Sequence, residues 1–280
     1  MKTILVPIES HEAIRPTLET ALMLARRFDS YVEGFALRFR VNEFVAVDMA
    51  GAIPLESLRD ENLEEARRAR QLFESFMQER AVPRAAVGTT QFSYGWLDDA
   101  PEGEGVVGSY GRVFDVIAIG RPEPKAIGLQ VRALESGLFE SGRPVLLAPP
   151  MPLRTFGTNV LIAWNCSTEQ ARTTALAMPL LQRAERVTVL YVKGGAEVPG
   201  PPASDIVAYL QRNGIPATLM TVEAGSRSNT GEAVLTTAKS LNCDLLVKGA
   251  YTQSRLRQMI FGGATRHIIA NATLPVLMAN

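Results

Sequence analysis

The stretch that decides the fold reads Cys243-Asp-Leu-Leu-Val-Lys-Gly249-Ala-Tyr-Thr252-Gln-Ser-Arg255-Leu-Arg257-Gln-Met-Ile-Phe-Gly262-Gly263-Ala-Thr265-Arg-His-Ile-Ile269. Its apolar run predicts a buried strand that ends at Gly249, and the later glycine pair predicts a helix that begins at Ala264. Such a strand, loop and helix N-terminus suit a phosphate, because bare backbone N–H groups and the partial positive charge of the helix both attract an anion. Alternatively, the glycines only end a strand and interrupt a helix.

This segment resembles the signature of the universal stress protein family, Gly-x2-Gly-x9-Gly-Ser/Thr, whose glycines and hydroxyl contact the ribose and phosphates of ATP. Gly249 matches the first glycine and Gly262 the third, whereas Thr252 stands at the second glycine and Gly263 at the hydroxyl position. The resemblance implies the family's fold and a nucleotide site. The two departures add a β-branched side chain to that site and remove one oxygen from it.

The pattern of the first half of the chain recurs in the second half. Ile4-Leu-Val-Pro-Ile-Glu9-Ser matches Val160-Leu-Ile-Ala-Trp-Asn165-Cys, 156 residues later. Two further apolar runs match in the same order, one around Asp115 and Asp244 and one around Pro144 and Pro275. Three paired segments in one order indicate a duplication. The chain therefore resembles a tandem universal stress protein, with the stiff Pro149-Pro150-Met151-Pro152 as the connector.

Apolar runs that alternate with helical periodicity predict an α/β fold. We expect two tandem Rossmann-like domains, residues 1–150 and 151–280, each with a five-stranded parallel sheet in the order 3-2-1-4-5 and helices on both faces. The expected strands are residues 3–8, 31–37, 86–92, 114–119, 144–148, 160–164, 187–192, 217–222, 244–248 and 275–279. The expected helices are residues 12–28, 55–78, 106–113, 131–140, 169–183, 204–212, 230–240 and 264–271.

Composition narrows the class of protein. The chain has 280 residues, of which 46% are apolar, and this is enough for two hydrophobic cores. Its 29 basic side chains balance 29 acidic ones, and this neutral balance argues against nucleic acid or an anionic membrane surface as a partner. No apolar signal core or membrane-spanning run occurs, so we expect a soluble, cytoplasmic protein. Cys166 follows the first strand of its sheet and Cys243 precedes the fourth, so the two should lie too far apart for a disulfide.

Doubly wound sheets bind ligands beyond the carboxyl ends of their strands, where the strand order reverses. In the second half that point lies between the strands that end at Trp164 and Gly249. An acid follows the first strand in family members that bind ATP, and here that position holds Asn165, which can bond a base or ribose or simply form an Asx turn. The candidate nucleotide-binding residues are Ala163, Asn165, Val192, Gly249, Thr252, Arg255, Gly262, Gly263, Ala264 and Thr265. Arg255 and Arg257 could instead be exposed helix residues.

The first half is expected to have lost the anion site. Counting back from the paired prolines, Val131 and Arg132 stand where the second half has Gly262 and Gly263, and Glu123-Pro124 lies near the position of Thr252. A β-branched residue closes the approach to the backbone, and a carboxylate repels phosphate. We therefore expect at most one nucleotide site per chain.

Other candidate residues have simpler explanations. Neither His11 nor His267 stands at a metal-ligand spacing from Cys or Asp, and His267 is expected to pack or cap. Glu9 and Glu12 could act as acid and base, but a turn and a first helical turn explain both. The apolar segment from 44 to 54 could line a pocket or an interface, or it could cover the edge of its own core.

The sequence favours a stress-response binding protein that holds ATP or AMP in its second domain, with Mg²⁺ only alongside ATP. The alternatives are a structural or partner-binding module with an empty crevice or another small ligand and, at most, slow ATP hydrolysis. The resemblance implies that the two halves pair through their fifth strands as an intramolecular pseudo-dimer, and it leaves a homodimer of chains open.

Overall fold

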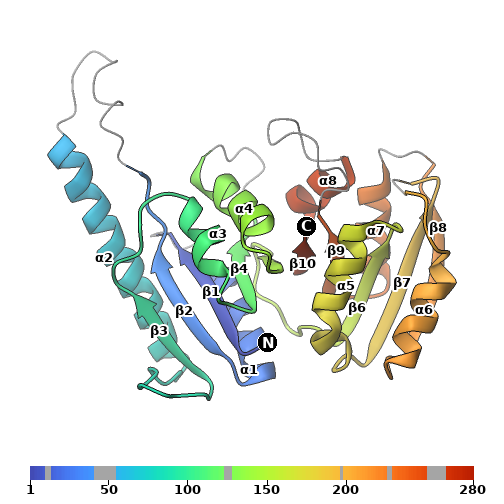
Figure 1. Cartoon of the computed structure of the whole chain (residues 1–280), viewed down its shortest axis with the longest axis horizontal. Coiled ribbons are helices and arrows are strands. Elements are labelled where there is room, and N and C mark those ends of the chain that lie inside the picture. The colour runs from blue at the N-terminus through green and yellow to red at the C-terminus, as the bar shows by residue number, and fades with distance from the viewer. Residues whose placement is uncertain (10–13, 41–54, 123–127, 196–197, 226–228, 251–262) are drawn as a thin grey trace, which may run out of the picture. The chain divides into compact units, whose positions relative to one another are not determined.

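A computed structural model of the chain describes residues 1–9, 14–40, 55–122, 128–195, 198–225, 229–250 and 263–280 (Figure 1). The chain divides into two compact units, one formed by Met1–Ile119 with Lys125–Arg143 and the other by Gly120–Pro124 with Pro144–Asn280. The apolar segment from 44 to 54 and residues His11 and Glu12 lie outside the described residues, and the predictions about them stay predictions.

The first unit contains a parallel sheet in the order β3-β2-β1-β4. Its central strand β1 is buried from Ile4 onward, because apolar side chains on both faces are covered by helices. The expected arrangement of the first four strands is confirmed. The strands are β1 (Thr3–Ile8), β2 (Tyr31–Ala36), β3 (Ser93–Leu97) and β4 (Val116–Gly120).

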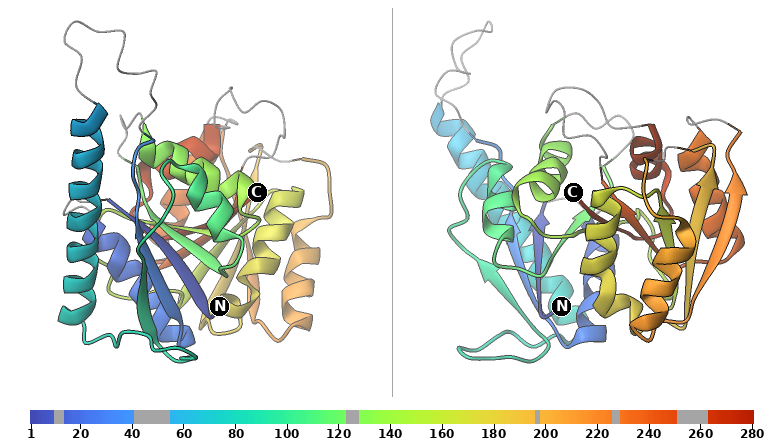
Figure 2. Two further views of the ribbon diagram at one scale, coloured as in Figure 1. Left: turned by 60° about the vertical axis from the view of Figure 1, so that its left-hand side comes forward. Right: turned by 45° about the vertical axis from the view of Figure 1, so that its right-hand side comes forward.

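Helices cover both faces of this sheet (Figure 2). The helices are α1 (Arg15–Phe28), α2 (Leu55–Glu79), α3 (Gly105–Gly111) and α4 (Leu129–Glu140). In α2, Phe73 packs so closely on β2 that a Cβ at Gly34 would lie 2.9 Å from its ring. In α3, Gly111 packs on Ile117 of β4. Ile117 of β4 and Glu33 of β2 both pair with Leu5 of β1, so their side chains lie on the same face of the sheet. Gly34 follows Glu33 and therefore faces the other side. Because α3 packs on Ile117 and α2 packs on Gly34, these two helices lie on opposite faces.

The third strand was predicted at residues 86–92, and that prediction is wrong. Val87 and its Thr neighbours are typical of a strand, but Gly88 has a φ of 81° and Val87 is fully exposed, so the segment turns through solvent. The strand begins instead at Ser93, where Tyr94 is buried edge-on against Phe73 at 5.8 Å between ring centroids. Burial of the aromatic side chain outweighs local β-propensity.

The strands of the second unit follow the order β5-β10-β9-β6-β7-β8. The five strands from the second half of the sequence are parallel and follow the predicted order 3-2-1-4-5. The strands are β5 (Val145–Ala148), β6 (Asn159–Trp164), β7 (Arg186–Lys193), β8 (Ala217–Glu223), β9 (Leu245–Gly249) and β10 (Val276–Ala279). The helices are α5 (Thr168–Leu181), α6 (Ala203–Arg212), α7 (Thr230–Ser240) and α8 (Gly263–Asn271).

Residues from the first half of the sequence complete this second unit. β5 runs antiparallel to β10, with Leu146 opposite Leu277. Arg121 donates from Nη1 to the carbonyl oxygens of Ala270 at 2.7 Å and Ala272 at 3.2 Å, which satisfies acceptors at the end of α8. The predicted domains, 1–150 and 151–280, follow the sequence repeat, whereas the contacts place β5 with the second unit.

The two halves begin their sheets with the same hydrogen-bonded arrangement. Asp115, just before β4, accepts from the backbone amides of Lys2 and Thr3 at the start of β1. Asp244, just before β9, accepts from the amides of Thr158 at 2.9 Å and Asn159 at 2.8 Å. Each pair of amide donors is separated from its counterpart by the same 156 residues as the sequence repeat. The duplication predicted from sequence therefore extends to individual hydrogen bonds.

Candidate functional site

The candidate site of the second unit lies where the strand order reverses, between β6 and β9. The two strands are parallel neighbours, and Ile162 registers with Val247 shortly before both strands end. The helices that follow these strands lie on opposite faces of the sheet, α5 after β6 and α8 after β9. This is the edge at which α/β sheets of this kind bind ligands.

Asn165 follows β6 and bonds within its own turn. Its Oδ1 accepts from the backbone N of Ser167 at 3.3 Å and from the Ser167 hydroxyl at 2.9 Å. Ser167 in turn caps α5, because its Oγ accepts from the amide of Gln170 at 3.1 Å. This is the Asx turn that the sequence left as an alternative, with Cys166 at a φ of 64° inside it. A contact between Asn165 and a ligand stays a prediction.

Gly249 has a structural reason to lack a side chain. A Cβ there would lie 2.5 Å from the backbone N of Gln170, so the end of β9 can pack against α5 only as glycine. The Gly249 amide donates to the buried Oε1 of Gln170 at 2.8 Å. Sequence reasoning missed Gln170, because a glutamine in a first helical turn is normally exposed. The amide of Gly249 is thus used by the protein itself, and its approach to a phosphate stays a prediction.

The first turn of α8 reaches the end of β9 on the opposite face from α5. Gly263 is exposed, and no described atom lies within 4 Å of the position that its Cβ would occupy. Ala264 and Thr265 are buried. Ala163 and Val192 are also buried, and strand alternation places both on the α8 face with Lys248. Thr252, Arg255 and Gly262, together with Arg257, lie outside the described residues.

Lys248 is the residue that sequence reasoning overlooked at this edge. Its side chain is 8% exposed, and its Nζ donates to the carbonyl of Gly249 at 2.7 Å and to Thr265 Oγ1 at 3.4 Å. Burial lowers the pKa of Lys248 to about 8, an effect that the negative charge of Glu169 partly offsets. The signal in the sequence was a single charged residue at the end of an otherwise apolar strand.

Trp164 ends β6 on the α5 face. Its side chain is 6% exposed, and its indole N–H has no hydrogen-bond partner among the described residues. Most buried polar groups have a partner, so this N–H is a donor available at the same edge of the sheet.

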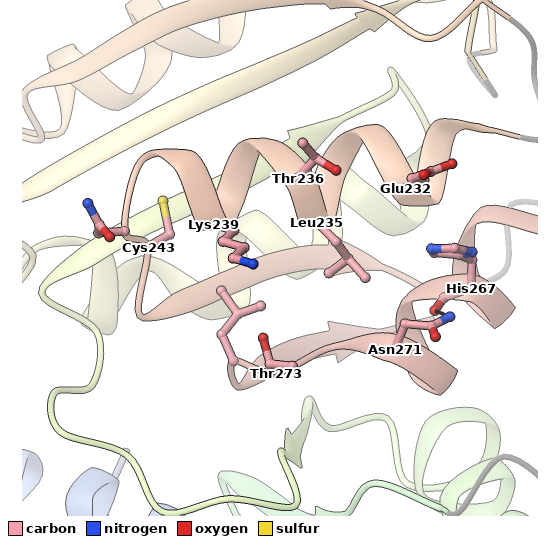
Figure 3. A pocket seen from close by; sticks show the side chains of 10 residues that line it. Glu232, Leu235, Thr236, Lys239, Cys243, His267, Asn271 and Thr273 are labelled. Atoms are coloured by element: carbon pink, nitrogen blue, oxygen red, sulfur yellow. Dashed lines mark hydrogen bonds between the residues drawn. The ribbon is translucent and has the colours of Figure 1, made fainter.

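A groove of about 520 Å³ lies between α7 and α8, and its lining extends to residues just before β9 and β10 (Figure 3). Glu232 and Lys239 of α7 face His267 and Asn271 of α8 across it, and Cys243 lies at its far end (Figure 3). The two helices approach closely beside this groove, since a Cβ at Gly231 would lie 2.8 Å from that of His267, whose predicted packing or capping role stays a prediction. None of the seven candidate nucleotide-binding residues that the structure describes lines this groove.

The remaining titratable candidates form no further centre among the described residues. No group of three or more His, Cys, Asp or Glu side chains there is placed to hold a metal ion. Cys166 and Cys243 form no disulfide with each other, as expected, and Cys166 Sγ donates to the carbonyl of Pro201 at 3.2 Å. Burial raises the pKa of the Cys243 thiol to about 11, which disfavours the thiolate at neutral pH.

Comparison with known families assigns the second half of the chain. Residues 158–280 match the sequence model of the universal stress protein family. These residues are a universal stress protein domain. No match was found among curated proteins.

The likeness to universal stress proteins extends over the whole chain at the level of the fold. A universal stress protein from Archaeoglobus fulgidus DSM 4304 superposes with a TM-score of 0.72 at 16% identity, covering 99% of this chain and 98% of its own. A putative universal stress protein from Pseudomonas aeruginosa UCBPP-PA14 superposes with a TM-score of 0.54 at 16% identity, covering 100% and 93%. The first half therefore shares the fold of the universal stress protein domain that follows it.

The equivalent edge of the first half has a different charge. Glu9, the counterpart of Asn165, accepts from Gln130 Nε2 in the first turn of α4 at 2.9 Å. Arg132, the counterpart of Gly263, is exposed and pairs with Glu104 at 3.4 Å. The counterpart of Lys248 is Ile119, which is buried and apolar. Glu123 and Pro124 lie outside the described residues, so their part in the predicted loss of the anion site stays a prediction.

Proposed function

We propose that the universal stress protein domain binds an adenine nucleotide, ATP or AMP, at the carboxyl ends of β6 and β9, and that it acts in the cytoplasm by occupancy rather than by turnover. The observation that supports this most is the first turn of α8, which meets the end of β9 at the reversal of strand order, with exposed Gly263 beside it. Backbone amides in such a turn attract phosphate. Mg²⁺ would accompany ATP, as it does in other phosphate sites.

A binding role without robust turnover follows from the groups at this edge. Asn165 and Thr265 are neutral, and the two hydrogen-bond acceptors of Lys248 among the described residues are neutral oxygens, with the Glu169 carboxylate acting on it only through space. A ligand that prefers one arrangement of the loop after β9 would change the surface that this domain presents to partners.

A second candidate function is a partner-binding or structural module whose crevice holds no nucleotide. The specific observation in its favour is that Asn165 Oδ1 and the Gly249 amide both bond within the protein. The β5–β10 pair also supports the pairing of the two halves through their fifth strands, the pseudo-dimer implied by the family resemblance.

Isothermal titration of the full chain with ATP, AMP and adenosine, together with mass spectrometry of ligand released from fresh protein, distinguishes these candidates. We expect near-stoichiometric nucleotide binding that Gly263→Val weakens at least about 10-fold, because a branched side chain blocks the approach of a phosphate to the backbone. Gly105→Val is the matched control, since Gly105 also begins a helix, is exposed and has no described neighbour within 4 Å of its missing Cβ. Absence of bound nucleotide and of any titration signal would favour the second candidate.

A further inference from the structure

The buried ammonium of Lys248 is not required by the fold. Lys248 and Ile119 occupy equivalent positions, each one residue before the glycine that ends its strand and four residues after the shared aspartate. Both side chains are buried, with Ile119 5% exposed and Lys248 8% exposed. Because the first half builds the same strand with an apolar residue, the positive charge in the second half needs another explanation.

The surroundings of Lys248 leave its charge uncompensated. Its two hydrogen-bond acceptors, the Gly249 carbonyl and the Thr265 hydroxyl, are neutral, and they use two of its three N–H groups. No described carboxylate forms an ion pair with it, although Glu169 acts on it through space from the first turn of α5. The N-terminal end of α8 adds further positive charge beside it. A buried charge without a counter-charge is costly, so an anion that supplies the missing charge is strongly favoured here.

A second substitution changes the charge of the edge in the same direction. The first half has the carboxylate of Glu9 after its first strand, and that carboxylate bonds to Gln130 in the first turn of α4. The second half has neutral Asn165 at that position. At these two positions the second half has therefore lost a negative charge and gained a positive one, whereas exposed Arg132 of the first half, which pairs with Glu104, has neutral Gly263 as its counterpart.

We propose that Lys248 is the charge-selecting residue of this site and that its free N–H binds an oxygen of a phosphate group held against the first turn of α8. The ligand class is a phosphate monoester or a terminal phosphate, and the phosphate of a nucleotide and free inorganic phosphate share this chemistry. For the nucleotide the inference rests on the proposed function, whereas for inorganic phosphate it stands alone. Thr265 Oγ1, 3.4 Å from Nζ, fixes the position of the ammonium beside that turn.

The test compares AMP with adenosine, which differ only in the phosphate, by titration of the full chain at pH 7. We expect the wild-type chain to bind AMP about 10-fold or more tightly than adenosine, since a charge-assisted hydrogen bond contributes that much. Lys248→Met should abolish most of this preference. Lys239→Met is the matched control, because it removes the same charge from an exposed position on α7. An unchanged AMP preference in Lys248→Met would overturn the inference.

Two further measurements separate this inference from the proposed function and from a structural role of the lysine. In a chain labelled with ¹³C-lysine, inorganic phosphate should shift the Cε signal of Lys248, identified by its absence in Lys248→Met. If phosphate shifts this signal but no nucleotide binds, the proposed function fails and the inference stands. Suppose instead that Gly263→Val blocks nucleotide binding, that Lys248→Met leaves the AMP preference unchanged and that phosphate does not shift the Lys248 signal. In that case the proposed function stands and the inference fails. A Tm of Lys248→Met well below that of wild type would show a structural lysine and overturn the inference.

Discussion

Lys248 is titratable, whereas its counterpart in the first half, Ile119, is not. This difference affects the stability of the folded chain. The pKa of Lys248 in the folded protein is about 8, below its ordinary value of 10.5, so the unfolded chain binds more protons between these pH values. The burial penalty is fully present below pH 8 and disappears as the pH rises to 10.5. Without ligand, stability of the wild-type chain should therefore rise over this interval relative to a variant without the lysine.

Lys248→Met tests this directly. At pH 7 we expect the variant to be more stable than wild type by about 3 kcal/mol, and we expect the two to converge near pH 10.5, because the pKa difference corresponds to that energy. Urea unfolding of both proteins at several pH values measures the difference, with Lys239→Met as the control for general charge effects. A stability difference that does not change with pH would contradict the assigned burial of the ammonium.

The sequence predicted residue roles less well than it predicted strands. Gly249 was singled out for a ligand, yet the backbone of α5 at 2.5 Å already requires a glycine there. Gln170 and Lys248 escaped notice because a polar residue beside apolar ones normally points to solvent, and only the fold shows that both are buried. A side chain's partner depends on segments that are distant in sequence, whereas periodicity records only local burial.

At the scale of elements, continuous apolar runs were sufficient to place most strands. β1 and β6 were predicted within one residue because each is buried on both faces and is bounded by polar residues. β3 was misplaced because its burial depends on single aromatic contacts with α2, which no local pattern encodes. Helix boundaries moved by a few residues, as for α5, which ends at Leu181 rather than Arg183.

The β5–β10 pair leads to a prediction about fragments of the chain. A fragment of residues 151–280 lacks β5 and leaves one edge of β10 with unpaired backbone groups, whereas a fragment of residues 143–280 retains the pair. Exposed apolar edge strands associate with other chains. We expect the shorter fragment to associate more strongly as its concentration rises than the longer one, in which β10 keeps its partner strand. Light scattering after size-exclusion chromatography measures this, and identical behaviour of the fragments would contradict it.

At the scale of the whole molecule, the duplication predicts that equivalent aspartates stabilise both halves. Burial opposes ionisation of Asp115, but the amides of Lys2 and Thr3, with the charges of the N-terminus and Arg143, hold its pKa below the ordinary value. Stability from this group is therefore present above the unfolded pKa and is lost as the pH falls through the lower folded pKa. Asp244 accepts from the two amides equivalent to those of Lys2 and Thr3.

Asp115→Asn and Asp244→Asn should each destabilise the chain by about 1–3 kcal/mol at pH 7, because each removes a charged acceptor of two backbone amides. For Asp115→Asn the loss should shrink at acidic pH, where the wild-type carboxyl is itself protonated. Denaturant unfolding at pH 7 and at acidic pH measures both effects, with Asp205→Asn, on the exposed side of α6, as the control. A loss confined to one half would argue against equivalent roles.

The antiparallel strand pair also has a consequence for synthesis on the ribosome. Val145 is synthesised about 130 residues before its partner Met278. β5 therefore cannot pair with β10 until β10 has left the ribosome. Such a distant contact raises the contact order of the second unit and slows its folding. During that delay, a chaperone or a neighbouring nascent chain of the same protein could occupy the open edge of β5.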